Sequence, residues 1–177
     1  MLRPARFEDE RGFFSESFNR QAFSDATGLN TMFVQDNLSF SRATHTVRGL
    51  HYQRPPHAQA KLVSCLAGRI IDVAVDVRVG SESYGKWTSA VLDSSEGWQI
   101  YVPTGFLHGF MTLQADCLVS YKTSDYYSAE CDGAVAFDDP DLAIDWGQGR
   151  ADVTLSEKDA RAGAFSEFQS PFKTGAV

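Results

Sequence analysis

Apolar and polar residues alternate most regularly in residues 70–79, IIDVAVDVRV. Ile71, Val73 and the alternate valines that follow occupy one set of positions, and Asp72 and Asp76 belong to the other. Successive side chains of a β-strand point to opposite faces, so this pattern predicts a strand. We expect the strand to be half buried, with its valine face in the core and its aspartate face polar.

Shorter runs of the same kind recur through the middle of the chain. They predict strands at residues 62–66, 87–92, 99–102, 109–113 and 118–122. Turn-forming pairs such as Ala67-Gly68 and Gly80-Ser81 separate these runs. Many short strands with frequent turns indicate an all-β protein, and a closed or double-sheet arrangement leaves few strand edges exposed. We therefore predict a small all-β barrel or jelly roll.

Two short helices are predicted, at residues 19–26 and 155–162. Asn19 is a candidate N-cap, and Gly28 stands where a left-handed residue would end the first helix. Ser156 and Asp159 have the spacing of a capping box at the start of the second. No internal repeat or low-complexity linker interrupts the sequence, so we expect residues 1–177 to form a single domain.

Charge and composition limit the partners. The net charge of −7 argues against a broad nucleic-acid surface, although a local basic cluster can still bind one small anion. No apolar run reaches the length of a membrane span, and the opening MLRPARFEDERG does not resemble a signal peptide. The cysteines, Cys65, Cys117 and Cys131, form no CxxC pair, which fits a reducing compartment. We expect a cytoplasmic protein that binds neither nucleic acid nor membrane.

The first residues that could bind an anion or transfer a proton are Arg48, His51 and Lys61, in the stretch TVRGLHYQRPPHAQAKLV. Gly49 permits a bend. Arg48 lies on the face opposite His51 if the strand is regular, and joins that face if Gly49 forms a bulge. Lys61 begins the next predicted strand, and hairpin geometry would bring it near His51 on one sheet face. The alternative is that Arg48 and Lys61 are solvated charges at strand ends.

Three further side chains could point into the barrel interior together with His51. His108 in VPTGFLHGF shares its predicted face with Phe106 and Phe110, which also fits a core histidine bonded to the backbone. Tyr121 in LVSYKTSDYY would point inward, as a proton donor or as a core aromatic residue. Asp159 is either the third helical residue of a capping box or a functional carboxylate.

The histidines among these residues could instead be ligands of a metal ion. A catalytic zinc or iron ion requires three or four His, Cys or carboxylate ligands. His51 and His108 offer two, without a His-x-His pair or a nearby glutamate, and His57 lies in a proline-rich loop. We therefore expect no catalytic metal.

Several motifs then match one known family in order and spacing. They are RGLHYQ, AQAKLV, VPTGFLHGF, SYKTSDYYS, DDPDLAIDW and LSEKD, with FEDERGFF and SPF near the two ends. Over essentially the whole chain, the sequence resembles the dTDP-4-dehydrorhamnose 3,5-epimerase family. The resemblance implies a cupin-type jelly-roll barrel with a few short flanking helices. Pro103-x-Gly105-x-x-His108 is similar to the second cupin motif.

The resemblance implies an isomerase of dTDP-rhamnose biosynthesis. Such an enzyme converts dTDP-4-dehydro-6-deoxy-D-glucose to dTDP-4-dehydro-L-rhamnose by proton exchange at C3 and C5, without metal or other cofactor. The reaction needs a base, an acid on the opposite face and positive charge near the C4 ketone oxygen. By resemblance, His51 is the base, Asp159 orients it and Tyr121 is the acid. Lys61, with Arg48, stabilises the enolate oxygen.

The resemblance also implies how substrate is bound. The residues assigned to the dTDP-sugar are Arg11, Glu16, Gln35, Asn37, Arg48, His108, Asp132 and Lys158. In the family some of these contacts come from a partner subunit, so a homodimer is implied. Two features depart from the family: Asp132 stands where we expect glutamate, and the strand expected before Phe7 is missing or precedes Met1.

Three alternatives remain. The first is a mono-epimerase that acts at C3 only or C5 only, because the same base and acid would serve it. The second is a metal-dependent cupin oxygenase or isomerase. The third is a nucleotide-sugar binding module without activity, which would have no need for His51, Tyr121 and Asp159 together.

Overall fold

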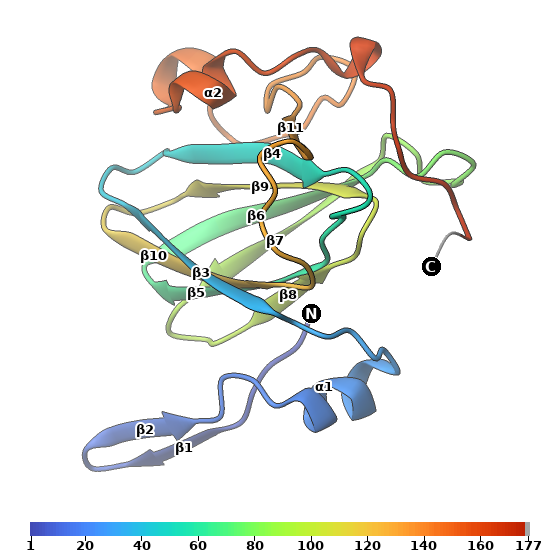
Figure 1. Cartoon of the computed structure of the whole chain (residues 1–177). Helices are drawn as coiled ribbons and strands as arrows, with labels where there is room; N and C mark the ends of the chain where they lie inside the picture. The colour runs from blue at the N-terminus through green and yellow to red at the C-terminus, as the bar shows by residue number, and fades with distance from the viewer. Residues whose placement is uncertain (176–177) are drawn as a thin grey trace.

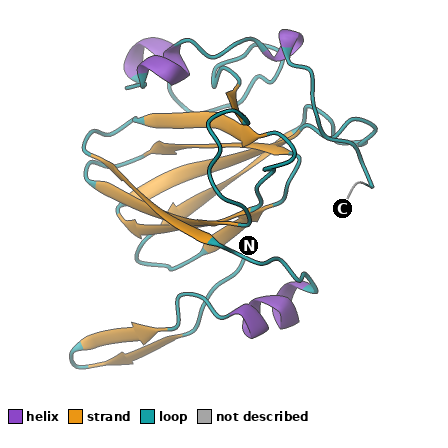
Figure 2. Cartoon of the chain, in the orientation of Figure 1, coloured by secondary structure: helices purple, strands orange, loops and turns teal. Residues whose placement is uncertain are grey.

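A computed structural model describes residues 1–175 as two large antiparallel sheets and a separate hairpin, flanked by short helices (Figures 1 and 2). The strands are β1 (Arg6–Asp9), β2 (Gly12–Ser15), β3 (Gln35–Ser41), β4 (Val47–Gln53), β5 (Lys61–Ala67), β6 (Arg69–Asp76), β7 (Trp87–Asp93), β8 (Gln99–Val102), β9 (Phe106–Thr112), β10 (Cys117–Thr123) and β11 (Asp132–Ala134). The helices are α1 (Arg20–Thr27) and α2 (Glu157–Ala160), with 3-10 turns at Arg150–Asp152 and Phe165–Glu167. The predicted all-β class with short flanking helices is confirmed.

The two large sheets form the barrel. One has the strand order β3-β10-β5-β8, and the other has the order β11-β4-β9-β6-β7. Most neighbouring strands are distant in sequence, as expected for a jelly roll. Figure 1 shows α2 beside β4 and β11 at one end of the barrel, and α1 with the β1–β2 hairpin beyond the other end. Every predicted strand is present. The largest differences are of three residues: β9 begins at Phe106 rather than at residue 109, and β6 ends at Asp76 rather than at residue 79.

β6 is buried on both faces, so the prediction of a half-buried strand is wrong. Val73 packs with Phe137 and Trp146, which belong to the segment after β11. Ala74 points the other way and packs with residues of the four-stranded sheet. Asp72, on the face of Ala74, has no exposed surface. The local pattern identified the valine face correctly, but it could not show that the opposite sheet covers the aspartates.

Both helices begin at the predicted caps. The Asn19 side chain accepts a hydrogen bond from a backbone N–H in the first turn of α1, and Gly28 ends that helix with φ of 70°. Ser156 caps α2 by accepting a hydrogen bond from the N–H of Asp159. α2 ends at Ala160 and is therefore shorter than predicted. Each helix within residues 1–175 falls short of the length and apolarity that a bilayer-spanning helix requires.

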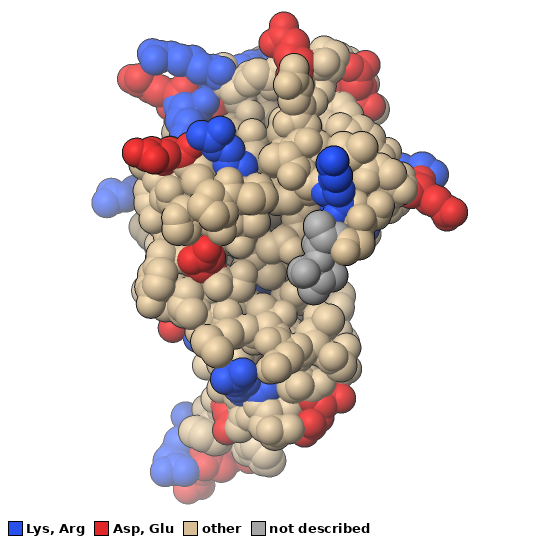
Figure 3. All heavy atoms as spheres, turned by 45° about the vertical axis from the view of Figure 1, so that its right-hand side comes forward, with Lys and Arg blue, Asp and Glu red and all other residues tan. Residues whose placement is uncertain are grey.

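Charged side chains of both signs are interspersed on the face drawn in Figure 3, with uncharged surface between them. This face therefore lacks the continuous basic stripe that is typical of nucleic-acid binding. The three cysteines, Cys65, Cys117 and Cys131, are buried and free.

Candidate active site

The barrel contains a cavity lined by strands of both sheets and by α2. It consists of two adjoining pockets of about 240 Å³ and about 560 Å³, which share His51, Lys61, Tyr121 and Lys158 in their walls. Its lining includes every site residue predicted from the sequence except Arg11 and Glu16. The other predicted residues come from six strands and from α2, so the fold gathers them from most of the chain.

Gly49 produces a bulge in β4 that turns Arg48 and His51 toward the same cavity. The register of β4 against β9 shifts between Arg48 and His51, and both side chains line the larger pocket. Gly49 has φ of 120°, and a Cβ at this position would lie 2.7 Å from the Cα of Gly109. Only glycine fits this close approach. Of the two orientations considered for Arg48, the bulged one is therefore correct.

His51 and Asp159 form a hydrogen-bonded pair at the cavity wall. The Nε2 of His51 lies 2.5 Å from Oδ1 of Asp159. The Asp159 side chain is 4% exposed and that of His51 is 30% exposed, so the carboxylate lies behind the ring. Burial would raise the pKa of Asp159, but hydrogen bonds and the charge of His51 hold it below its ordinary value. An ionised Asp159 selects the tautomer with the proton on Nε2, which leaves Nδ1 as a proton acceptor.

Asp159 has both of the roles that were considered for it. Its backbone N–H is capped by the hydroxyl of Ser156, at 3.1 Å. Its carboxylate bonds to His51 of β4. The helix cap fixes the backbone and the carboxylate is aimed at the ring, so capping and orientation of His51 are combined in one residue.

Lys61 reaches the cavity from the opposite sheet. β5 belongs to the four-stranded sheet and β4 to the five-stranded one, so the predicted hairpin between Lys61 and His51 and their shared sheet face are wrong. The loop of residues 54–60 crosses between the sheets, and the two side chains line the cavity from different walls. Burial lowers the pKa of Lys61 to about 8, although Asp72 and Asp132 act to raise it.

Tyr121 of β10 also reaches the cavity from the four-stranded sheet. It pairs with Val63 of β5, and it lines both pockets. Val119, two residues earlier on the same face, is fully buried in the core. Burial raises the pKa of Tyr121, while Arg48 acts to lower it. The phenol therefore stays protonated at neutral pH and can donate a proton.

His108 is the cross-strand neighbour of His51 and lines the larger pocket. Its Nε2 lies 2.9 Å from Oδ2 of Asp72, and both side chains are buried. His108 is thus a satisfied interior histidine, but its partner is a carboxylate rather than the backbone. Sequence reasoning missed Asp72 because it assigned the residue to an exposed face. An aspartate within a strongly apolar strand was the available signal.

Polar groups line the smaller pocket. Lys158 of α2 is ion-paired with Asp132 of β11. The hydroxyl of Tyr127 donates to the same carboxylate at 3.3 Å. The amide of Gln35 accepts from the N–H of Tyr127 at 3.0 Å and donates to Asn37 at 2.8 Å. These bonds join four predicted binding residues, two of them directly, to Tyr127, which sequence reasoning did not select although it lies within the motif SYKTSDYYS.

Gln53 is a second residue that the sequence prediction did not select. Its side chain is buried and donates to the backbone carbonyls of His57 and Tyr126, at 2.7 Å and 3.1 Å. It also accepts from the N–H of Ser128 at 2.7 Å. Gln53 therefore ties the loop after β4 to the loop after β10, and this fixes the position of Tyr127 between them.

Arg11 and Glu16 are the predicted residues that lie away from the cavity of their own chain. Arg11 is at the turn of the β1–β2 hairpin, which projects beyond the barrel in Figure 1. Its side chain is 85% exposed and pairs with Asp9. Their predicted contacts with substrate stay a prediction.

Within residues 1–175, no three His, Cys, Asp or Glu side chains are grouped closely enough to hold a metal ion. His57, the weakest of the three histidines considered, pairs with Asp125 at 3.3 Å and is not part of the cavity wall.

Comparison with known proteins identifies the family. The model of the family described as dTDP-4-dehydrorhamnose 3,5-epimerase matches residues 1–167. The chain belongs to this family. The predicted family is thus confirmed, and so is the predicted class of enzyme, an isomerase of the dTDP-sugar 3,5-epimerase type.

Three relatives illustrate the likeness. The dTDP-4-dehydrorhamnose 3,5-epimerase of Sinorhizobium fredii is 49% identical, over 98% of this chain and 88% of that protein. A dTDP-6-deoxy-D-glucose-3,5-epimerase from Legionella pneumophila, solved in complex with dTDP-4-keto-L-rhamnose, has a TM-score of 0.88 and 44% identity, covering 94% of this chain and 87% of that one. A 3′-monoepimerase from Streptomyces bikiniensis, in complex with dTDP-quinovose, has a TM-score of 0.84 and 32% identity, covering 93% and 82%. The cupin-type fold of the epimerase family is therefore confirmed.

Proposed function

We propose that this epimerase converts dTDP-4-dehydro-6-deoxy-D-glucose to dTDP-4-dehydro-L-rhamnose, and that residues 1–177 act as one domain. The observation that carries the proposal is the His51–Asp159 pair in the wall of a cavity that also contains Lys61 and Tyr121. A base, an acid and a cation in one cavity provide what proton exchange beside a ketone requires. Family membership names the substrate.

Each side chain has a separate role in the proposed reaction. Nδ1 of His51 takes the proton from C3 or C5, and the electron pair of the broken C–H bond moves to the C4 oxygen. Lys61 and Arg48 stabilise the resulting enolate by their positive charge. Tyr121 then gives its proton to the carbon from the opposite face, which inverts that centre. Proton exchange with water returns His51 and Tyr121 to their starting states.

The polar residues of the smaller pocket suit the dTDP portion. Lys158 offers a cation to the diphosphate, while Gln35 and Asn37 offer amide groups that can bond to the nucleotide. Asp132 holds Lys158, and its shorter side chain still reaches that partner although glutamate was expected at this position. His108 lines the larger pocket, and we assign to it a contact with the sugar.

Proton NMR in heavy water tests the proposed function. The substrate is incubated with the enzyme after dialysis against a chelator, and loss of signal at C3 and C5 is followed together with product formation. Deuterium at both carbons, with conversion to the rhamno product, is the expected result. Deuterium at one carbon would select the mono-epimerase instead. No exchange until a metal is restored would overturn the proposal in favour of a metal-dependent enzyme.

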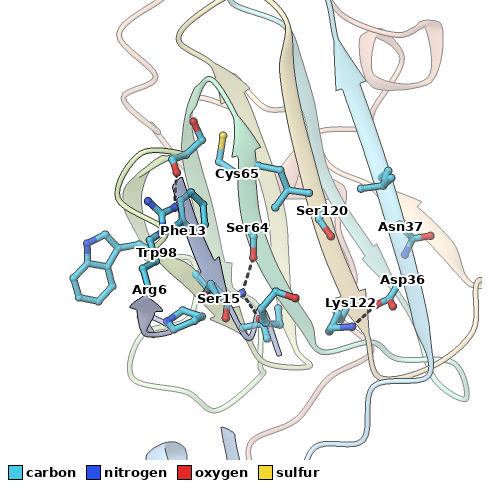
Figure 4. A pocket seen from close by; sticks show the side chains of 18 residues that line it. Arg6, Phe13, Ser15, Asp36, Asn37, Ser64, Cys65, Trp98, Ser120 and Lys122 are labelled. Carbon is cyan, nitrogen blue, oxygen red and sulfur yellow. Dashed lines mark hydrogen bonds and ion pairs between the residues drawn. The ribbon is translucent and has the colours of Figure 1, made fainter. Parts of the chain in front are cut away.

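We also propose that the chain forms a homodimer through the outer face of the four-stranded sheet. Leu38 and Leu66 on this face are 69% and 51% exposed, which is unusual for large apolar side chains gathered in one place. A hollow of about 520 Å³ lies here. Figure 4 shows Ser64 and Ser120 of the sheet on one side of it and Phe13 of the hairpin on the other. A second copy of this chain would cover this surface.

The hollow and the cavity meet at one residue of β3. Asn37 is part of the wall of both, so a group bound in the outer hollow lies close to the nucleotide end of the cavity. The hairpin of a second copy, which carries Arg11 and precedes Glu16, could reach it there. This arrangement would account for two predicted binding residues that lie far from their own cavity.

Subunit complementation is the experiment for the shared site. His51→Ala and Arg11→Ala variants are each expected to have low activity, because one lacks the base and the other a substrate contact. Mixed dimers should recover part of the activity, since one of their two cavities contains both His51 and the partner's Arg11. Sedimentation velocity gives the mass of each sample. A monomeric enzyme with full activity, or dimers without recovery, would contradict the shared site.

A fall in activity at alkaline pH is expected from Lys61. Its ammonium form stabilises the enolate and exists below the pKa of about 8, so kcat/KM should decline as pH rises through that value. A lysine at its ordinary pKa of 10.5 would remain charged there, and the pKa of Tyr121 is raised rather than lowered. In Lys61→Arg, whose guanidinium stays charged, this decline in kcat/KM should move to higher pH. If the decline stayed at the same pH in that variant, the titrating group would not be Lys61.

A further inference from the structure

Asp72 is a fully buried carboxylate to which the proposed reaction assigns no role. Its Oδ2 accepts a hydrogen bond from Nε2 of His108, at 2.9 Å, and its side chain has no exposed surface. Its Oδ1 is also buried and has no hydrogen-bond partner among residues 1–175. A buried anion with one unpaired oxygen is costly unless another charge compensates it.

Lys61, on the facing sheet, has the opposite charge, and that charge is also incompletely compensated. Burial disfavours its ammonium form, and no hydrogen bond to another residue of the described chain offsets that cost. Among the charges that favour the ammonium, Asp72 has the largest effect, ahead of Asp132. A half-buried cation and a fully buried anion, each incompletely satisfied, therefore act on one another across the barrel interior.

The strand register explains why Asp72 is held at this place. In the pairing of β6 with β9, Asp72 lies opposite Phe110 and Ala74 lies opposite His108. Asp72 and His108 are therefore diagonal neighbours on the inner face of the sheet, which is the relation that allows their side chains to bond. His108 occupies the cavity wall in front of the carboxylate and keeps its position fixed.

We propose that Asp72 is a positioning residue that supplies the counter-charge for Lys61 and thereby keeps the Lys61 ammonium available to the C4 oxygen. The inference rests on the proposed function, in which that ammonium stabilises the enolate. It explains why a carboxylate rather than an amide stands behind His108: an asparagine could accept the same hydrogen bond, but it would carry no charge.

Other groups around Lys61 do not replace this counter-charge. The charged and titratable side chains that share the cavity with it are Arg48, His51, Tyr52, His108, Tyr121, Tyr127, Asp132, Lys158 and Asp159. Asp132 is ion-paired with Lys158, and Asp159 bonds to His51. Lys158 itself acts against the charged form of Lys61. Of the carboxylates, Asp72 is the one with a buried oxygen left without a partner in residues 1–175.

Direct titration of Lys61 tests the inference without relying on catalysis. In protein labelled with [13C]lysine, the Cε resonance of Lys61 is followed against pH in the absence of substrate, and Lys61→Met identifies the resonance. The wild-type lysine should titrate at about 8. In Asp72→Asn its pKa should fall by about one unit, because the loss of a nearby opposite charge disfavours the ammonium. An unchanged titration would overturn the proposal even if the enzyme is an active epimerase.

The pH profile of activity provides the second measurement. A pKa lower by one unit would reduce kcat/KM of Asp72→Asn about tenfold relative to wild type at pH values above both pKa values. At acidic pH, where Lys61 is charged in both proteins, the two should differ little. An equal loss at every pH would indicate a structural defect and would overturn the proposal. If wild-type protein shows no proton exchange, the proposed function fails while the NMR titration still decides the role of Asp72.

Asp76→Asn is the matched control. Asp76 lies on the same strand and face as Asp72 and is equally buried, but its carboxylate pairs with Arg78 and accepts from the hydroxyl of Ser81. Its replacement should lower the melting temperature and leave the titration of Lys61 unchanged. If Asp72→Asn does not fold, Asp72→Ser, which is uncharged and smaller, takes its place in both measurements. A shifted Lys61 titration in the control would count against a specific role for Asp72.

Discussion

Replacing His51 with alanine is expected to abolish both proton exchange and epimerisation. The ring presents Nδ1 to the cavity because Nε2 is bonded to Asp159, and the neighbouring His108 is already engaged by Asp72. Removal of a positioned general base lowers a rate on the order of 10²- to 10⁴-fold. NMR in heavy water should therefore show C3 and C5 protons retained over times in which the wild-type enzyme exchanges them completely.

His57→Ala is the matched control for this experiment. His57 is a partly exposed histidine that pairs with Asp125 and does not line the cavity. Its backbone carbonyl, which Gln53 binds, is kept in the variant. Activity should stay close to that of wild type. Full exchange at both carbons in His51→Ala would show that another group is the base.

Replacing Tyr121 with phenylalanine is expected to separate exchange from inversion. His51 and Lys61 remain, so protons should still be removed and returned on the same face, with deuterium incorporated into unchanged substrate. Inversion requires a donor on the other face, and without the hydroxyl its rate should fall on the order of 10²- to 10⁴-fold. The ratio of deuterated substrate to product, measured by NMR, reports this separation directly.

Tyr126→Phe controls for the loss of a phenol close to the end of β10, the strand that carries Tyr121. Tyr126 is 62% exposed and does not line the cavity, so its hydroxyl is far from the proposed chemistry. The variant should form product at the wild-type rate. If Tyr121→Phe formed product as fast as wild type, or lost exchange and turnover to the same extent, Tyr121 would not be the acid of the second face.

The local elements were predictable because they depend on near neighbours in sequence. Alternation with a period of two identified β5 and β7 nearly to their ends, and Asn19 and Gly28 marked the ends of α1. The same reasoning pointed Tyr121 of β10 inward, as the structure has it. A strand period and a helix cap are properties of a few consecutive residues, so the tertiary structure did not alter them.

How the site is assembled was harder to predict from the sequence than the strands and helix caps were. His51 and Asp159 are 108 residues apart, and their pairing was expected only from the resemblance to a family. The hairpin predicted from the short loop before Lys61 does not exist, because that loop carries the chain from one sheet to the other. Loop length sets which pairings are possible, but long-range packing decides which one forms.

The sequence by itself determined the strands and the helix caps, since backbone preferences and side-chain periodicity act locally. By its motifs it also identified the family and the residues that carry the chemistry. Only the tertiary structure decided that Gly49 forms a bulge, that Lys61 faces His51 from the other sheet, and that Asp72 is buried behind His108. Each of these depends on how one sheet lies against another strand or sheet, and burial and charge compensation between distant residues follow from that packing.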